Sequence, residues 1–171
     1  NAQIHTCAWQ SASVRHIRSY DPYPLLNAEA VSEAVRLINS ARRPLALVGQ
    51  GVELGEAHHE LLAFLEKAHI PAACTMMGLS ALPSAHPLNM GMLGMHGTYE
   101  ANLAMQNADV VVAIGARFDD RVVGSPAKFA EAPKKIIHID IDPSSISKRV
   151  KADVPIVGDV KNVLSEMLGL W

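Results

Sequence analysis

Long apolar segments and an excess of either charge are both missing from this sequence. No uninterrupted apolar run approaches the roughly 20 residues that a transmembrane helix requires, so we expect no membrane role. The formal net charge is −2, and basic pairs such as Arg42-Arg43 and Lys134-Lys135 are scattered among acidic residues. Because a nucleic-acid surface needs clustered basic side chains, we expect no nucleic-acid partner.

Cysteine is scarce, and no metal-ligand spacing is present. Cys7 and Cys74 are far apart and match neither a disulfide framework nor a zinc motif, and a reducing cytoplasm suits such thiols. His58 and His59 would point in different directions on a helix, and the other histidines are isolated. We therefore expect no metal in this chain. No serine elbow or Cys–His pair in a recognisable context suggests a catalytic residue.

The remaining composition is that of one globular domain. With 171 residues, of which 49% are hydrophobic and 19% charged, the chain is long enough to bury a core of its own. It begins NAQIHTCAWQ, with neither an initiator methionine nor a signal-peptide pattern, which we interpret as a piece cut from something longer. Residues 1–26 show no clear period and are expected to form a linker or extended arm, whereas residues 27–171 form the domain.

From Asn27 onwards, helical spacing of apolar residues alternates with short continuous apolar runs. Asn27 is the expected N-cap of the first helix, and Arg42-Arg43-Pro44 ends that helix. Continuous Val, Ile and Ala runs are typical of parallel strands buried on both faces. The sequence therefore predicts an α/β fold, an open doubly wound parallel sheet with helices on both faces. The predicted strands lie in PLALVGQG, IPAACTM, ADVVVAIGA, KKIIHIDID and PIVGDV.

Unusual residues follow the predicted strands at their carboxyl ends. Right-handed crossovers bring these ends to one edge of the sheet, and open α/β sheets bind ligands at that edge. The sequence therefore predicts a ligand site formed by residues 49–51, 75–78, 115–120, 140–142 and 158–159.

Two of these segments resemble parts of a nucleotide site. GQGVELG is close to a dinucleotide fingerprint, but its spacing Gly49-x-Gly51-x-x-x-Gly55 is one residue longer than usual. A phosphate loop and a plain strand-to-helix turn are both open interpretations. Asp140 ends a strand where carboxylates commonly bind ribose hydroxyls, and Asp142 is expected to cap a following helix.

The segment LNMGMLGMHG is too rich in glycine for a regular strand or helix, yet too apolar for a solvated loop. Gly91, Gly94 and Gly97 would let its backbone come close to a neighbour. We consider two interpretations, a flexible apolar wall against a flat ligand and a methionine-filled irregularity of the core. His96 by itself does not establish catalysis.

The segment GARFDDRVVG surrounds one phenylalanine with charges directly after a strand. Its initial Gly-Ala pair leaves room for a ligand to lie against the backbone. Arg117 and Arg121 suit a pyrophosphate or a ribityl-phosphate chain, and Asp119 with Asp120 would hold the two arginines in place. The alternative is a solvated cluster of surface ion pairs, which contributes little to stability.

Together, GMLGMHGTYEANLAMQNADVVVAIGARFDDRVVG, KKIIHIDIDPSSISK and the final GDV are similar to the central domain of acetohydroxyacid synthase (acetolactate synthase) large catalytic subunits. The similarity extends from about Asn27 to the end of the chain. It implies the Rossmann-like central domain of thiamine-diphosphate enzymes, which binds FAD in this family. It also implies flanking domains that bind thiamine diphosphate and Mg²⁺, a homo-oligomer and a small regulatory subunit.

The family condenses two 2-oxo acids, pyruvate with pyruvate or 2-oxobutyrate, and releases CO₂ in branched-chain amino acid biosynthesis. The activating glutamate and the Mg²⁺ motif belong to the other domains, and this chain has Val160 where that motif, Gly-Asp-Gly, has its last glycine. The resemblance therefore implies that this chain alone is inactive and holds no catalytic residue. Asp159 is expected to be the N-cap of the last helix instead, and a ligand contact through the Gly158 backbone stays open.

Matched position by position, the resemblance implies FAD contacts at every predicted strand end and places Arg121 near the mouth of a substrate channel. Gln50 and Ser145 differ from the residues common in relatives. Two alternatives stay open, the central domain of a pyruvate-oxidase-like enzyme and a ligand-free structural spacer. The implied FAD contacts are Gly49, Gln50, Gly51, Thr75, Met76, Leu93, Gly94, Met95, His96, Gly115, Ala116, Arg117, Asp119, Arg121, Val122, Asp140, Ile141, Gly158, Asp159 and Val160.

Overall fold

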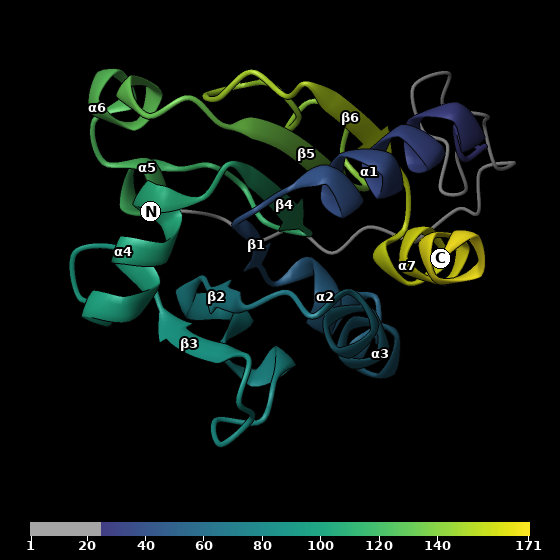
Figure 1. Cartoon of the computed structure of the whole chain (residues 1–171), viewed down its shortest axis with the longest axis horizontal. Coiled ribbons are helices and arrows are strands. Elements are labelled where there is room, and N and C mark those ends of the chain that lie inside the picture. Colours follow the sequence, from purple (N-terminus) through teal and green to yellow (C-terminus); the bar gives the residue numbers. More distant parts are fainter. Residues whose placement is uncertain (1–24) are drawn as a thin grey trace, which may run out of the picture.

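Six parallel strands form one sheet in the computed structural model, which describes residues 25–171 (Figure 1). Their order in the sheet is β3-β2-β1-β4-β5-β6. Cys7 and nearly all of the predicted linker lie outside the described residues. The strands are β1 (Pro44–Val48), β2 (Ala72–Cys74), β3 (Asn89–Met92), β4 (Val110–Ile114), β5 (Lys135–Asp140) and β6 (Val154–Val157).

The strand order reverses once, between β1 and β4. From β1 the chain builds β2 and then β3 on one side, and it returns to the other side of β1 to build β4, β5 and β6. Val48 of β1 pairs with Cys74 of β2 and with Ile114 of β4. This order confirms the predicted open doubly wound sheet, and such a fold binds ligands in the crevice at the reversal.

Helices cover both faces of the sheet, as the sequence predicts (Figure 1). One face carries α1 (Ala28–Ser40), α3 (His58–Ala68) and α7 (Val160–Leu170), and the other carries α4 (Tyr99–Asn107) and α6 (Pro126–Glu131). None of the helices within residues 25–171 has the length and apolar character that spanning a membrane requires. Three short helical segments follow β1, β2 and β4, namely α2 (Gly51–Leu54), η1 (Met76–Ala81) and α5 (Asp120–Val123).

The central strands β1 and β4 are continuous apolar runs because both of their faces are buried. In β4, Val110, Val112 and Ile114 belong to the core under α1, α3 and α7, whereas Val111 and Ala113 belong to the core on the other face. Such a strand has no solvated face on which a polar side chain would be expected.

Two local predictions are wrong. The glycine content of residues 89–97 predicts no strand, yet Asn89–Met92 forms β3 at the edge of the sheet. An edge strand tolerates the register shift between β2 and β3 and the φ of +84° at Gly91. Asp142 precedes a turn and not a helix, and its carboxylate accepts hydrogen bonds from the N–H and hydroxyl of Ser144 at 2.9 and 2.8 Å.

Two predicted helix caps are confirmed. Asn27 Oδ1 accepts a hydrogen bond from the N–H of Ala30 at 3.1 Å and begins α1. Asp159 Oδ1 accepts one from the N–H of Asn162 at 3.2 Å and begins α7. Each carboxyl or amide oxygen satisfies an N–H of the first helical turn that has no partner within the helix.

Candidate functional site

The turns that follow the six strands lie along one edge of the sheet. The parallel register pairs residues at or next to the ends of neighbouring strands, for example Val48 with Ile114 and Ile114 with Ile139. The segments after these residues therefore start side by side. The structure brings all the predicted site residues to this edge, at 49–51 after β1, 75–76 after β2, 93–96 after β3, 115–122 after β4, 140–141 at the end of β5 and 158–160 after β6.

At the strand-order reversal, the turns after β1 and β4 touch through their backbones. The N–H of Gly49 donates to the carbonyl of Ile114, and that of Gly51 donates to the carbonyl of Gly115, both at 3.0 Å. A Cβ on Gly115 would lie 2.6 Å from the Cα of Gly51. The room predicted beside Gly115 is thus filled by Gly51, and packing alone requires glycine at these positions.

Phe118 anchors the segment after β4, and this explains the charges around it. Its ring is 3% exposed and packs edge to face against Phe129, with centroids 6.1 Å apart. Arg117 and Arg121 on either side are exposed. Since the phenylalanine points into the core, its charged neighbours are left at the edge.

Asp119 has a different role from the one predicted. Its Oδ1 accepts hydrogen bonds from the N–H groups of Arg121 and Val122, both at 3.1 Å, and so caps α5. Among the residues that the structure describes, no ion pair joins Asp119 or Asp120 to Arg117 or Arg121. The prediction that the two aspartates hold the arginines is therefore wrong. The charges form no ion-pair cluster within the described chain.

The loop after β3 meets the segment after β4. Leu93 is buried and Met95 is 91% exposed, so the methionine-rich segment contributes both to the core and to the surface. A Cβ on Gly94 would collide with the carbonyl oxygen of Arg121. The side chain of Asn102, from α4, hydrogen-bonds Gly94 at both its N–H and its carbonyl. The sequence analysis did not identify Asn102. The one feature that could have pointed to it is its place inside a predicted helix, where asparagine has a low propensity.

The edge has an apolar half and a charged half. After β2 and β3 the exposed side chains include three methionines, with Met95 91%, Met76 71% and Met77 58% exposed. Gln50 after β1 and His96 after β3 are exposed polar residues in the same half. Near β4, the exposed side chains include those of Arg117 and Arg121. The two halves meet where the strand order reverses. An elongated ligand with one flat apolar end and one anionic end matches this arrangement.

His138 lies buried on β5, two residues before the edge. It is 1% exposed, its ring packs edge to face on Phe118 at 5.3 Å, and its Nε2 is 4.0 Å from Oδ2 of Asp140. Neither ring nitrogen has a hydrogen-bond partner with good geometry among the described residues. Burial lowers the pKa of His138, and the nearby Asp140 carboxylate and Ala116 backbone only partly oppose this. The imidazole is therefore neutral near pH 7.

Acidification is expected to destabilise the fold through His138. The unfolded imidazole takes up a proton as pH falls through about 6.5, whereas the folded pKa is lower. Between the folded and the unfolded pKa, the unfolded state binds more protons than the folded state. The free energy of unfolding therefore decreases as the pH is lowered, by at most about 1.4 kcal/mol per pH unit for one group. Urea unfolding at about pH 7 and about pH 5.5 measures this loss. His138→Phe should lose less stability than the parent chain, and equal losses would contradict the expectation.

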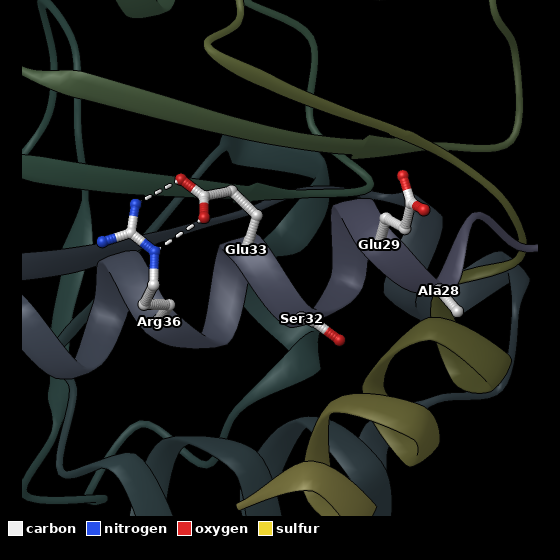
Figure 2. A pocket seen from close by; sticks show the side chains of 5 residues that line it. All are labelled: Ala28, Glu29, Ser32, Glu33 and Arg36. Carbon is white, nitrogen blue, oxygen red and sulfur yellow. Dashed lines mark hydrogen bonds and ion pairs between the residues drawn. The ribbon is translucent and has the colours of Figure 1, made fainter.

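A shallow hollow on the outside of α1 contains none of the predicted site residues. Figure 2 shows Ala28, Glu29, Ser32, Glu33 and Arg36 around it, with Glu33 and Arg36 pointing toward each other in an ion pair of 2.6 Å. An exposed pair on one helix contributes little, and we assign no ligand to this hollow. Within residues 25–171, no group of three or more His, Cys, Asp or Glu side chains is placed to hold a metal ion.

Comparison with known proteins gives one consistent set of relatives. The family described as thiamine pyrophosphate enzyme, central domain, matches residues 31–167, a range that contains every residue of the edge. The chain is 46% identical over 154 residues to the acetolactate synthase isozyme 3 large subunit of Escherichia coli (strain K12), covering 90% of this chain and 27% of that protein.

Two further relatives have similar names. The chain is 44% identical over 171 residues to the acetolactate synthase of Arthrospira platensis, covering 98% of this chain and 29% of that protein. It is 48% identical over 149 residues to the acetolactate synthase large subunit of Corynebacterium glutamicum, covering 87% of this chain and 24% of that protein. The chain thus spans about a quarter of the length of the curated relatives it matches.

Proposed function

This chain belongs to the family of thiamine pyrophosphate enzyme central domains, and on that premise we propose that residues 27–171 are the FAD-binding central domain of an acetolactate synthase large subunit. The observation that carries the proposal is the single edge at the strand-order reversal, where two exposed arginines without carboxylate partners in the described chain meet exposed methionines. The carboxyl edge at such a reversal is where doubly wound sheets usually bind dinucleotides.

The charged half of the edge fits the diphosphate and ribose of FAD. Arg117 and Arg121 are exposed and form no ion pair with a carboxylate of the described chain, so both guanidinium groups are available to phosphate oxygens. Asp140 Oδ1 accepts a hydrogen bond from the N–H of Asp142 at 2.9 Å. Oδ2, which lies 4.0 Å from Nε2 of the buried His138, has room in its hydrogen bonding for one ribose hydroxyl.

The apolar half fits the isoalloxazine ring. Met76, Met77 and Met95 are exposed there, and methionine sulfur makes favourable contacts with aromatic rings. In this proposal FAD supplies a flat apolar ring that stabilises the edge, and it takes no net part in the condensation. The chain's own residues bind and orient it.

The complete subunit, in this proposal, condenses pyruvate with pyruvate or 2-oxobutyrate and releases CO₂. Thiamine diphosphate and Mg²⁺ are held by flanking domains, and no residue of this chain is assigned a catalytic role. The chain alone is therefore proposed to be inactive. We extend the proposal to a cytoplasmic homo-oligomer with a small regulatory subunit. The small subunit is supported by the relatives at 46 and 48% identity, which are named as large subunits.

One observation favours a structural spacer without ligand as a second candidate. The contact between the turns after β1 and β4 accounts for glycine at positions 49, 51 and 115 with no cofactor present. It does not account for two exposed arginines without carboxylate partners beside a row of exposed methionines. Flavin binding distinguishes the two candidates.

Titration with FAD tests the proposed function directly. We expect the chain to quench flavin fluorescence on binding and ADP to displace the cofactor, because the arginines recognise the diphosphate that both molecules share. Riboflavin, which lacks the diphosphate, is the matched ligand control and should bind far more weakly. A chain that binds FAD no better than riboflavin would favour the spacer.

A further inference from the structure

We infer that Asn102 is a positioning residue, which holds residues 93–97 over the apolar half of the edge so that this loop faces the flavin ring. The inference rests on the proposed function, because it names the ligand that the loop contacts. It also makes a separate statement about the loop itself, namely that one side-chain amide fixes its backbone.

Asn102 makes three hydrogen bonds to this loop and its end. Its Oδ1 accepts from the N–H of Gly94 at 2.9 Å, and its Nδ2 donates to the carbonyls of Gly94 and Thr98, both at 3.0 Å. Both backbone groups of Gly94 are thus paired with one side chain, as they would be with a neighbouring strand. The loop is therefore tied to α4 in the middle of its course.

Thr98 ties the other end of the loop to the sheet. Its hydroxyl donates to the carbonyl of Met90 in β3 at 2.6 Å and accepts from the N–H of Ala101 at 3.2 Å, so it also caps α4. The N–H of Thr98 donates to the carbonyl of Met92 at 2.8 Å. With β3 before it and α4 after it, the loop has fixed ends. Between them, Asn102 fixes the backbone together with a turn inside the loop, in which the N–H of Gly97 donates to the carbonyl of Gly94 at 3.0 Å.

The clamp at Gly94 sets how the loop meets the segment after β4. Gly94 has a φ of +103°, and a Cβ there would collide with the carbonyl oxygen of Arg121. The methionine-rich loop after β3 and the charged segment after β4 therefore touch at Gly94. Met95 follows directly and is 91% exposed, so the clamped backbone presents an apolar side chain at the edge.

A role confined to the helix does not explain Asn102. Asparagine is less favourable than alanine in a helix, and Asn102 is exposed and gains no burial there. Asn107, on the same helix, donates from its Nδ2 to the carbonyl of Leu103 at 2.8 Å, a bond within the helix. It offers a matched control, since its amide holds no loop.

The experiment compares Asn102→Ala with Asn107→Ala in this chain. FAD and ADP are titrated separately, and hydrogen exchange of residues 93–97 is followed without ligand. For Asn102→Ala we expect FAD binding to weaken about tenfold, as for the loss of one or two hydrogen bonds, and ADP binding to stay within about twofold. The Gly94 amide should exchange at least about tenfold faster. Asn107→Ala should change none of these quantities.

A second variant keeps the test decisive if alanine unfolds the chain. Asn102→Asp retains an acceptor for the N–H of Gly94 but loses the donor to the two carbonyls, so it should lie between the parent and Asn102→Ala in both exchange and FAD affinity. A parent-like exchange rate at Gly94 in Asn102→Ala would overturn the clamp. An equal loss of FAD and ADP binding would overturn the positioning role. If the parent chain binds no FAD, the proposed function fails and the flavin part of this inference falls with it, while hydrogen exchange still decides the clamp.

Discussion

Gly115→Ala is expected to lower the free energy of unfolding by about 3 kcal/mol or more. Gly115 has a φ of +56°, which costs a residue with a Cβ about 1–2 kcal/mol. The new Cβ would also lie 2.6 Å from the Cα of Gly51, well inside the roughly 3.5–4.0 Å at which carbon atoms pack. The atoms in the way are the backbone atoms of Gly51, which cannot rotate aside as a side chain could. The turns after β1 and β4 would therefore have to separate.

Two further variants separate the causes of that loss. Gly49 does not have a positive φ, but a Cβ there would collide with the carbonyl oxygen of Gly115, so Gly49→Ala measures the collision alone. Gly169, near the end of α7, has open space around it, and Gly169→Ala should leave stability unchanged or raise it slightly. Urea unfolding of the three variants gives the comparison. A Gly115→Ala chain as stable as the Gly169→Ala chain would show that the two turns do not pack as described.

Arg117→Ala is expected to weaken FAD retention in the full-length subunit more than Arg121→Ala does. Arg117 follows directly on the turn at the strand-order reversal, and the buried ring of Phe118 fixes its backbone. A hydrogen bond between a charged donor and phosphate is worth roughly 1.5–3 kcal/mol, or about ten- to a hundredfold in affinity. Arg121 lies farther along, in α5, where its backbone contacts Gly94.

Equilibrium dialysis of FAD against each variant measures the difference. Arg42→Ala is the matched control, since Arg42 is an exposed arginine before β1, at the opposite end of that strand. It should retain FAD as the parent does. Equal occupancy in Arg117→Ala and Arg121→Ala would contradict the expected order, and a similar loss in Arg42→Ala would point to net charge as the cause.

The elements of the fold were predictable because each leaves its own local pattern. The strand Val110–Ile114 is buried on both faces and so reads as an unbroken apolar run. Asn27 and Asp159 stand directly before helical stripes, where a side-chain oxygen satisfies a free N–H. The position of the candidate site was predictable from these elements, because parallel strands joined by right-handed crossovers have their carboxyl ends at the same edge of the sheet.

The contacts across the edge were not predictable in the same way. Asp119 carries the same charge whether it pairs with an arginine or caps α5, and only the backbone direction after Phe118 decides between these roles. Gly115 is equally suited to a ligand and to a neighbouring turn, and the identity of its neighbour depends on the strand order. His138 and Asn102 owe their roles to residues on other elements, to which the sequence around them gives no pointer.

The reversal of strand order also constrains how the chain folds. The backbone of Arg43, just before β1, is bound by Asp109, just before β4, which is 66 residues away along the chain. Pairing of β1 with β4 is thus a distant contact, whose loop-closure entropy opposes early formation, whereas β1 and β2 are joined by a much shorter connection. We therefore expect each half of the sheet, β1 to β3 and β4 to β6, to gain order before β1 pairs with β4. A ligand that contacts the turns after both β1 and β4 stabilises the folded sheet, but its binding site forms only once β1 and β4 have paired.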